Sequence, residues 1–448
     1  MSTTNPDQAG AGRFVYRDHA PPRVRTLAAT AQRVLGRVAG GRLSALPFGV
    51  RFWDGSTIPA RSAKPGTPTV LIRDRHALAQ LLYEPNQIGL TRAWVERSLD
   101  LEGDLETVLA QREHFTGVHL TVRERAQLAL AALVAAGPRV LRRPAVPSIE
   151  AQPQGPRHSV ARDREAVRHH YELSNRFYEA MLGPTMVYSC AYFEDPADTL
   201  ERAQECKLET ICRKLSLAPG ERLLDVGCGW GSLLLHAARH HSVTGVGVTL
   251  SDAQAELARE RIERAGLSEQ LEIRVCDYRE VTDGPYDKIA SVGMYEHVGR
   301  DQLDHYAGHL HELLRPGGLF LNHGIARLRE RPRAEDTFIT RYIFPDGELH
   351  PVTDVLRSME SSSFEIRDVE SLREHYVLTL RRWVANLEAR AAEAIREVGE
   401  MRVRAWRLYL LGSADGFATG EISVFQVLSA RDGAPHGLPL GRRALLAA

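Results

Sequence analysis

The residues best suited to chemistry form a glycine-rich run, LDVGCGWGS at residues 224–232. Glycines after a strand allow the backbone to turn tightly and to approach a ligand, and the helix that follows presents its N-terminus. Dinucleotide-binding loops carry GxGxxG, whereas the spacing here is GxGxG, so a pyrophosphate is not the expected ligand. Taken alone, the run is a weak signal that a tight structural turn would also explain.

Two further polar segments end apolar runs of the kind that form buried strands. Thr249-Leu250-Ser251 ends one run and Cys276-Asp277-Tyr278-Arg279 ends another. Ligands of doubly wound sheets bind at the carboxyl ends of the strands, so the first segment is placed to hold a ribose and the second an adenine. Three suitable strand ends in this order predict a class I methyltransferase site for S-adenosylmethionine.

A parallel sheet must position these loops. Short apolar runs typical of buried strands occur at 223–226, 243–249, 271–276, 288–292 and 319–325. Helical patterns separate most of them, for example at 251–265 and 301–314, and a long helical stretch at 375–411 precedes a last strand at 421–428. Strands alternating with helices predict an α/β fold, a doubly wound Rossmann-like sheet covered on both faces.

Length and local composition divide the chain. Its 448 residues exceed what one small domain needs. Residues 144–158, PAVPSIEAQPQGPRH, are rich in proline and polar residues, as linkers are. We therefore predict a separate, smaller N-terminal domain at 1–143, a linker at 144–158, the methyltransferase domain at 159–435 and a tail at 436–448.

Charge and cysteine content exclude several classes of protein. Lys plus Arg and Asp plus Glu number 57 each, so the overall charge does not indicate a nucleic-acid partner. The five cysteines show no paired CxxC spacing, which indicates neither disulfides nor a zinc site and favours a reducing, cytoplasmic setting. The longest apolar stretch, 128–136, is too short to cross a bilayer, so membrane contact is expected to be peripheral.

A basic segment near the N-terminus allows two interpretations. Residues 24–38 mix apolar and basic side chains at roughly helical spacing. Such a segment could form an amphipathic helix that attracts anionic lipid headgroups. A solvated helix face explains the charge pattern equally well. The arginines of this region are Arg13, Arg17, Arg23, Arg25, Arg33, Arg37 and Arg42.

Five motifs occur in an order that resembles one protein family. They are HYELSN at 170–175, YSCAYF at 188–193, DVGCGWG at 225–231, SVGMYEHVG at 291–299 and YIFP at 342–345. Together they closely resemble the cyclopropane-fatty-acyl-phospholipid synthase family, which includes the mycolic acid cyclopropane synthases. The resemblance covers about residues 165–430, and the preceding region resembles the more variable N-terminal domain of the longer bacterial members.

The resemblance implies positions for the cofactor and for a bound ion. The family's S-adenosylmethionine contacts fall on Tyr188, Ser189, Asp225, Gly227, Gly229, Thr249, Leu250, Ser251, Gln254, Asp277, Tyr278 and Arg279. Its bicarbonate ion is held by side chains that fall on Glu296, His323 and Tyr376. Backbone groups that contact the same ion fall on Cys190 and Ile325. No metal is implied.

These residue types suit transfer of one carbon to an alkene, here the double bond of an unsaturated phospholipid acyl chain. An alkene is a weak nucleophile, so it must be aligned with the sulfonium methyl group and kept from water. Aromatic faces can stabilise the cation left on the acyl chain. Candidates are Tyr188, Tyr192, Phe193 and Tyr295, each of which could equally be core packing.

The cation must then lose a proton from the added methyl group, which closes a cyclopropane ring. Bicarbonate can serve as the base. Glu296 would accept a hydrogen bond from the hydroxyl of the ion, and His323 and Tyr376 would donate hydrogen bonds to its oxygens. Taken singly, a histidine such as His323 is more often structural than catalytic, and Glu296 could simply cap a helix. Their proposed catalytic roles therefore rest on the family resemblance.

Other outcomes stay open. If the cation shifts before it loses its proton, the product is a methylene- or methyl-branched acyl chain. The acceptor could instead be a small amine or hydroxyl compound, or the chain could bind lipid without catalysis. The sequence sets no oligomeric state, and a homodimer is one alternative. Several family members carry a cysteine where Ser413 stands, so a thiol-dependent step is not expected.

Overall fold

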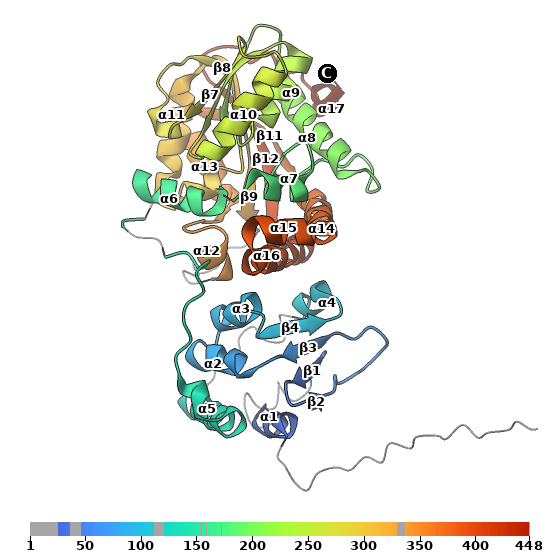
Figure 1. Ribbon diagram of the computed structural model, residues 1–448. Coiled ribbons are helices and arrows are strands. Elements are labelled where there is room, and N and C mark those ends of the chain that lie inside the picture. Colours follow the sequence, from blue (N-terminus) through green and yellow to red (C-terminus); the bar gives the residue numbers. More distant parts are fainter. Residues whose placement is uncertain are drawn as a thin grey trace, which may run out of the picture.

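The computed structural model describes residues 26–35, 46–111, 121–152, 155–157, 159–171, 173–328 and 337–447. Two sheets organise this part of the chain, one of four strands near the N-terminus and one of eight strands in the second half. Figure 1 shows them as two units, with the smaller one at the lower end of the molecule.

The N-terminal unit has a sheet of its own. Its strands, in spatial order, are β2 (Thr57–Ile58), β1 (Gly49–Phe52), β3 (Thr69–Ile72) and β4 (Leu99–Glu102). Its helices are α1 (Leu27–Leu35), α2 (Arg75–Tyr83), α3 (Gln87–Val95), α4 (Leu105–Leu109), α5 (Val122–Ala136) and the 3₁₀ turn η3 (Pro138–Leu141). β1 and β3 are parallel, whereas β2 and β4 pair antiparallel at the two edges, so the sheet is mixed.

Helix α1 lies within the basic segment at 24–38. Leu27 and Ala28 are buried in a small core with Phe48, Val50 and Ile58, whereas Arg33 is exposed. Leu27 and Ala28 thus pack on the domain's own sheet, as the solvated-face interpretation expects. The remaining arginines of the region lie outside the described residues: Arg13, Arg17, Arg23, Arg25, Arg37 and Arg42.

The large sheet confirms the predicted α/β fold. Its main strands, in spatial order, are β11 (Phe364–Ser371), β12 (Ile422–Arg431), β9 (Leu314–Arg327), β8 (Tyr286–Val292), β5 (Arg222–Val226), β6 (Thr244–Thr249) and β7 (Leu271–Val275). The short β10 (His350–Pro351) pairs with β9. Strands β5 to β9 run parallel, and β12 is antiparallel to both β9 and β11. The strand order reverses between β5 and β8, where such sheets bind ligands.

Helices cover both faces of this sheet because successive strand residues point to opposite sides. Leu223 belongs to the core on one face and Leu224 to the core on the other. The first face is covered by α8 (Leu200–Lys214), α9 (Ser232–His241), α10 (Asp252–Arg264) and α17 (Arg442–Ala447). The second is covered by α11 (Leu303–Leu313) and α13 (Val352–Ser361). The short 3₁₀ turns are η4 (Tyr278–Glu280), η5 (Tyr295–His297) and η6 (Arg300–Gln302).

A third helical layer lies between the large sheet and the N-terminal unit (Figure 1). Its helices are α6 (Val160–Tyr171), α7 (Asn175–Leu182), α12 (Phe338–Tyr342), α14 (Arg373–Ala389), α15 (Ala391–Val398) and α16 (Glu400–Ala418). The helical stretch expected at 375–411 is therefore three helices. Gly399, whose φ is +84°, separates the last two. Few other residues adopt that backbone conformation easily, and the chain turns there.

The N-terminal unit packs directly on this layer. Trp94 of α3 donates from Nε1 to the Arg404 carbonyl at 3.1 Å, and Arg404 donates from Nε to the Trp94 carbonyl at 2.7 Å. The Arg404 guanidinium also lies 4.1 Å from the centre of the Trp94 ring. Trp94, Val95 and Leu105 share one hydrophobic core with α7, α14 and α16.

The expected linker is partly buried. Glu150 is a nearly inaccessible carboxylate that accepts two hydrogen bonds from Arg92 of α3, at 2.8 and 2.9 Å. It also accepts a hydrogen bond of 2.8 Å from the Tyr342 hydroxyl of α12. Residue 151 donates to the Arg341 carbonyl at 2.7 Å. This segment therefore joins the N-terminal unit to α12, which carries part of the YIFP motif.

The C-terminal segment differs from the expected tail. Within 436–448, α17 packs on α8: Leu445 is buried, and Arg213 donates to the Leu446 carbonyl at 3.0 Å. Among the helices that the structure describes, none combines the length and the apolar character needed to span a bilayer.

Candidate active site

A cavity, partly open to solvent, lies at the carboxyl ends of β5, β6, β7 and β8. Eleven of the twelve expected cofactor contacts line it, namely Tyr188, Ser189, Asp225, Gly227, Gly229, Thr249, Leu250, Gln254, Asp277, Tyr278 and Arg279. Ser251 does not line it. Its buried hydroxyl caps α10 by accepting a hydrogen bond from the Gln254 amide at 3.3 Å.

The glycine loop forms the floor of the cavity between β5 and α9. Gly227 and Gly229 have φ values of +78° and +53°, in the left-handed region that favours glycine. A Cβ atom on Gly227 would lie 3.2 Å from Cγ of Met294, which also lines the cavity. Arg261 donates to the Trp230 carbonyl at 2.6 Å, and Trp230 donates to Asn175 at 2.9 Å. The HYELSN motif therefore braces this loop.

The other two strand ends are held by hydrogen bonds within the protein. The Thr249 hydroxyl donates to the Gln254 side chain at 2.8 Å. Asp277 accepts two hydrogen bonds from Arg279, at 2.6 and 2.7 Å, and Arg279 also pairs with Asp163 of α6 at 3.0 Å. These contacts fix the walls before any ligand binds.

Two buried charged groups also line the cavity. Burial raises the pKa of Asp225 to about 7 and lowers the pKa of Lys207 to about 8, while each opposes the other's shift through its charge. Lys207 lies on the inner side of α8 and was not expected from sequence motifs. The available sequence signal is the presence of three polar residues on the buried, otherwise apolar face of this helix: Gln204, Lys207 and Lys214.

An aromatic cluster adjoins the cavity. Tyr188, which lines the cavity, lies 5.2 Å from Trp383 and 5.6 Å from His170 between ring centres. His170 accepts from or donates to the Tyr188 hydroxyl at 3.2 Å. Trp406 and Phe344 also belong to this cluster, and its further rings are Tyr171, Tyr178 and Tyr409. The cluster therefore combines residues from α6, α7, α14 and α16.

Three of the four proposed cation-stabilising rings lie outside the described cavity lining. Tyr192 stacks on His375 at 4.8 Å, and Phe193 lies beneath the Arg382 guanidinium at 4.5 Å. Tyr295 is buried, and its hydroxyl donates to the Ile325 carbonyl at 2.7 Å. Of the four, only Tyr188 lines the cavity.

The SVGMYEHVG motif links the cavity to a second group of polar residues. Gly293 and His297 line the cavity, and Glu296 lies between them in η5. Glu296 Oε1 accepts a hydrogen bond from the Ile325 amide at 2.7 Å. Its Oε2 is buried and has no hydrogen-bond partner among the described residues. Burial raises the pKa of Glu296 to about 7.

His323 and Gln426 share this lack of partners. They lie opposite each other on β9 and β12. Both ring nitrogens of His323 and both amide atoms of Gln426 are buried without a hydrogen-bond partner among the described residues. Burial, with the charges of Lys207 and Lys214, lowers the pKa of His323 well below its usual value, so its imidazole is neutral. We call Glu296, His323 and Gln426 the base group.

Tyr376, Cys190 and Ile325 do not line the cavity. The Tyr376 ring of α14 packs at a tilt against Phe417, with 4.6 Å between ring centres, and burial raises the pKa of Tyr376. The Cys190 thiol donates to the Ala191 carbonyl at 3.3 Å, and burial raises its pKa as well. The Ile325 amide and carbonyl are already paired, with Glu296 and Tyr295.

The sheet order and the glycine loop at its switch point define a class I methyltransferase, the class that uses S-adenosylmethionine. The model of one family, mycolic acid cyclopropane synthetase, matches residues 158–427. The chain belongs to this family.

Similar proteins cover different shares of the chain. It is 37% identical over 404 residues to the probable fatty acid methyltransferase of Pseudomonas putida, covering 89% of this chain and 95% of the relative. It is 40% identical over 275 residues to the cyclopropane-fatty-acyl-phospholipid synthase of Escherichia coli K12, covering 61% and 70%. The solved mycolic acid cyclopropane synthase CmaA1, complexed with SAH and CTAB, superposes with a TM-score of 0.57 at 34% identity, covering 60% and 98%.

Proposed function

We propose that this protein transfers the methyl carbon of S-adenosylmethionine to the double bond of an unsaturated phospholipid acyl chain, and that loss of a proton then closes a cyclopropane ring. One observation carries the proposal. The cavity wall runs from Gly293, whose amide donates to the His323 carbonyl at 2.7 Å, to His297 beside Glu296, and both Glu296 and His323 carry buried polar atoms without a hydrogen-bond partner among the described residues. A plain methyl transfer to an amine or hydroxyl compound needs no such sealed polar group.

The cavity residues fit the cofactor. Gly227 and Gly229 leave a backbone cradle free of side chains, and Asp225 and Lys207 offer opposite charges for an amino acid moiety. Tyr278 provides a ring for an adenine, and Gln254 an amide beside the ribose position. S-adenosylmethionine supplies an electrophilic methyl group when bound. The chain's task is to hold it in line with the alkene and to exclude water.

The aromatic cluster suits the acyl chain. Tyr188 lines the cavity and packs against Trp383 and Trp406, and the ring faces of such a cluster can stabilise a cation on the acyl carbon. The layer around them is the largest hydrophobic core of the described chain and draws on α7, α14 and α16. Water is therefore kept from the cation, which would otherwise be trapped as an alcohol.

The base group suits a bicarbonate ion. Buried polar atoms normally have partners, so Glu296 Oε2, the His323 ring and the Gln426 amide are ready to bind a small polar guest. Glu296 would accept a hydrogen bond from the hydroxyl of the ion, and His323 would donate one to its oxygens. By the family pattern, Tyr376, Cys190 and Ile325 would complete the site. Because Ile325 N–H already donates to Glu296, binding through that amide would require the two to exchange partners.

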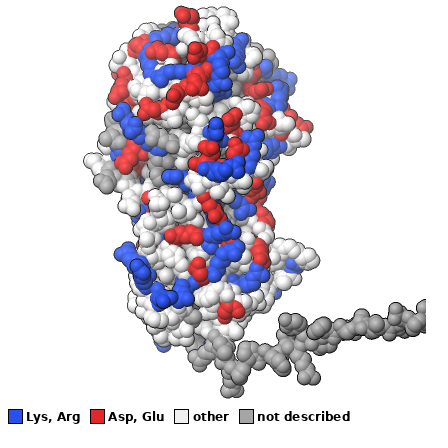
Figure 2. Space-filling view, viewed as in Figure 1, with Lys and Arg blue, Asp and Glu red and all other residues white. Residues whose placement is uncertain are grey.

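We further propose that the N-terminal domain contacts the lipid surface, where the protein would act as a peripheral cytoplasmic enzyme. Helix α5 exposes apolar side chains at Leu130 and Val134, both 62% accessible, and at Val122, 85% accessible. The exposed Arg142 and Arg143 follow closely. Apolar residues beside arginines are typical of interfacial helices on anionic lipid. Elsewhere, on the face shown in Figure 2, basic and acidic side chains are interspersed.

The direct test is incubation with vesicles of an unsaturated phospholipid and methyl-labelled S-adenosylmethionine. We expect label in the extracted fatty acids, with upfield ring protons in the proton NMR spectrum. Calorimetry would measure cofactor binding separately. Cofactor binding with no label in any lipid would refute the acyl substrate, whereas no cofactor binding would refute the enzyme itself.

A second product has specific support. The Pseudomonas putida relative, which matches 89% of this chain, is named a probable fatty acid methyltransferase, whereas the match to the Escherichia coli cyclopropane synthase spans 61% of this chain. A cation that shifts before deprotonation would yield a methylene-branched chain of the same mass as the ring. Vinylidene signals in the NMR spectrum, in place of upfield ring protons, would identify this alternative.

Lipid contact can be tested by sedimentation with anionic phospholipid vesicles. Leu130→Asp with Val134→Asp should reduce the bound fraction several-fold and leave cofactor binding intact. Ile395→Asp, a substitution of a residue 40% exposed on α15, is the matched control and should bind vesicles as the wild type does. Equal binding by all three proteins would refute the role of α5.

A further inference from the structure

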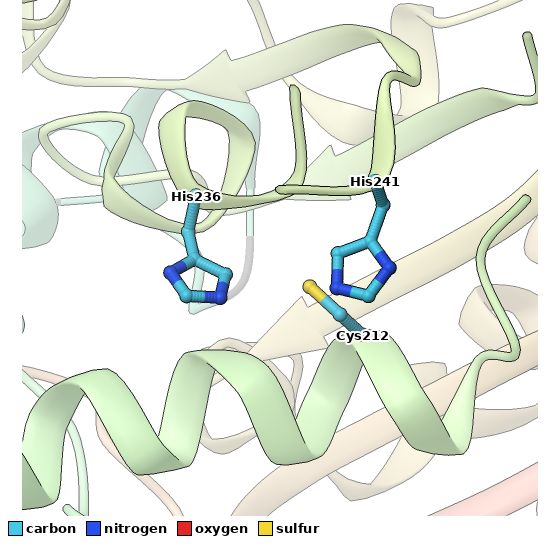
Figure 3. Close-up of side chains that lie close together, drawn as sticks. All are labelled: Cys212, His236 and His241. Carbon is cyan, nitrogen blue, oxygen red and sulfur yellow. The ribbon is translucent and has the colours of Figure 1, made fainter. Parts of the chain in front are cut away.

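One cysteine and two histidines meet on the outer helices, away from the cofactor cavity. Cys212 lies on α8, and His236 and His241 lie on α9. Their ligand atoms all fall within 4.8 Å of one another. Figure 3 shows the Cys212 sulfur between the two imidazole rings. None of the three residues lines the cavity.

Glu209 adds a fourth ligand of the right type. It lies one turn before Cys212 on α8, and its Oε2 is 2.9 Å from His236 Nε2 and 3.2 Å from His241 Nε2. Ligand atoms around a tetrahedral zinc ion lie about 3.3 Å apart when the bonds to nitrogen and oxygen are about 2.0 Å. Glu209 Oε2 thus already lies at nearly this spacing from each of the two imidazole nitrogens. The other oxygen, Oε1, accepts from Arg213 at 2.8 Å, which orients the carboxylate.

The surroundings shield such a site without closing it. Cys212 is fully buried, whereas the side chains of His236, His241 and Glu209 are 14%, 17% and 29% exposed. The thiol therefore lies at the buried end of the site. The other three ligands lie at its partly exposed end, where an ion can enter.

We propose that Glu209, Cys212, His236 and His241 bind one divalent transition-metal ion of the zinc type. Binding exchanges the thiol proton for a metal–sulfur bond and releases that proton, while both imidazoles coordinate as neutral ligands. Four protein ligands leave no position for substrate, which defines a structural site. The ion ties α8 to α9, and α9 begins at Ser232, directly after the glycine loop.

Cysteine spacing could not indicate this site, because it contains a single cysteine. The ligands come in two helical pairs, Glu209 with Cys212 and His236 with His241, and only the packing of α8 on α9 brings the pairs together. The site is independent of the proposed reaction, since it neither lines the cavity nor belongs to the base group.

Cobalt is the sharpest probe, because a thiolate ligand gives Co²⁺ an intense charge-transfer absorption and tetrahedral coordination gives it strong visible bands. We expect the full chain, freed of metal by chelator, to bind one equivalent of Co²⁺ with both features and to lose them when Zn²⁺ is added. Zinc should also raise the Tm. Absence of stoichiometric binding would overturn the proposal and leave only a hydrogen-bonded carboxylate–imidazole cluster.

Matched variants separate this site from adventitious binding. Cys212→Ser should abolish the charge-transfer band and weaken binding at least about tenfold. Cys206→Ser, a substitution of another buried cysteine on α8, should keep both. His241→Gln should weaken binding as strongly, whereas the exposed neighbour His240→Gln should not. A band that survives in Cys212→Ser, or equal losses in each pair, would refute the assignment; circular dichroism checks that each variant is folded.

Discussion

The cofactor cavity and the base group differ in whether their polar side chains have hydrogen-bond partners within the described protein. In the cavity, Asp277 is paired with Arg279 and Thr249 with Gln254. In the base group, Glu296 Oε2 and both His323 nitrogens are buried without partners among the described residues. Unpaired buried polar atoms destabilise a fold. The first region is thus preorganised by the chain alone, whereas the second has the composition of a site that a small polar guest completes.

The largest expected effect comes from removing the acceptor of the base group. Glu296→Gln should lower turnover by about 10²- to 10⁴-fold, because a proton-transfer partner is lost, and should leave cofactor affinity unchanged. Labelled-methyl assays and calorimetry measure the two quantities. Glu360→Gln, at an exposed position on α13, is the control and should change neither. A turnover equal to wild type would remove Glu296 from the mechanism.

The base group should also make stability depend on pH. Burial raises the pKa of Glu296 to about 7 from 4.5, so the folded state holds the proton more tightly than the unfolded chain. The contribution is complete below about pH 4.5 and is lost as the pH rises towards about 7, by about 3 kcal/mol at most. Relative to Glu296→Gln, the wild type should lose that much free energy of unfolding in urea between about pH 5 and pH 8.

Comparison with this variant is needed because Asp225, whose pKa is also raised to about 7, adds a loss of its own in the same pH window. If wild type and Glu296→Gln depend on pH identically, then the Glu296 carboxylate is stabilised in the folded protein by a group that already neutralises it. The contrast between the two regions would then disappear.

A smaller effect should follow from disturbing the preorganised region. Gly227→Ala forces a side chain onto a backbone with φ +78° and into contact with Met294, and we expect cofactor affinity to fall about tenfold. Gly220→Ala imposes a similar conformation, φ +83°, in open space before β5, and should lower stability without changing affinity. Equal affinity losses would mean that strain spreads through the fold and is not specific to the loop.

The smallest effect is expected at Ser413, which is half-buried on α16. Ser413→Cys restores the residue of several family members. Because the proposed chemistry needs no thiol, turnover should stay within about twofold and the free energy of unfolding within about 0.5 kcal/mol. A clear gain in rate would show that the sulfur atom contributes to the reaction.

The sequence predicted those parts of the fold that local pattern controls. The apolar runs at 223–226 and 271–276 lie within one residue of β5 and β7. β5 is buried along most of its length, whereas β7 is an edge strand that buries Leu271 and Ile273 and exposes Glu272. β11, at the other edge, was missed because only three of its eight residues, Phe364, Ile366 and Val369, are apolar. The helix break at Gly399 and the docking of α17 depend on tertiary packing, which periodicity does not report.

The site divides in the same way. Gly227 was predicted from the spacing of its motif after a strand, whereas Glu296 was predicted only from the family resemblance. Lys207, Gln426 and Trp406 were not, since each lies in an ordinary helix or strand and reaches its place only through the packing of α8, β12 and α16. Whether the expected catalytic and cofactor residues act as assigned stays a prediction for the variants above.

The Glu150 contacts bear on any attempt to shorten this protein. A chain trimmed at residue 144 would keep the carboxylate but lose Arg92, its bidentate partner from α3. Removing one member of a buried ion pair commonly destabilises a protein by about 3–5 kcal/mol. The strain would fall on Tyr342 and the YIFP segment beside the aromatic cluster. An inactive fragment would therefore not prove that the missing portion recruits lipid; it must first be shown to retain a properly seated α12.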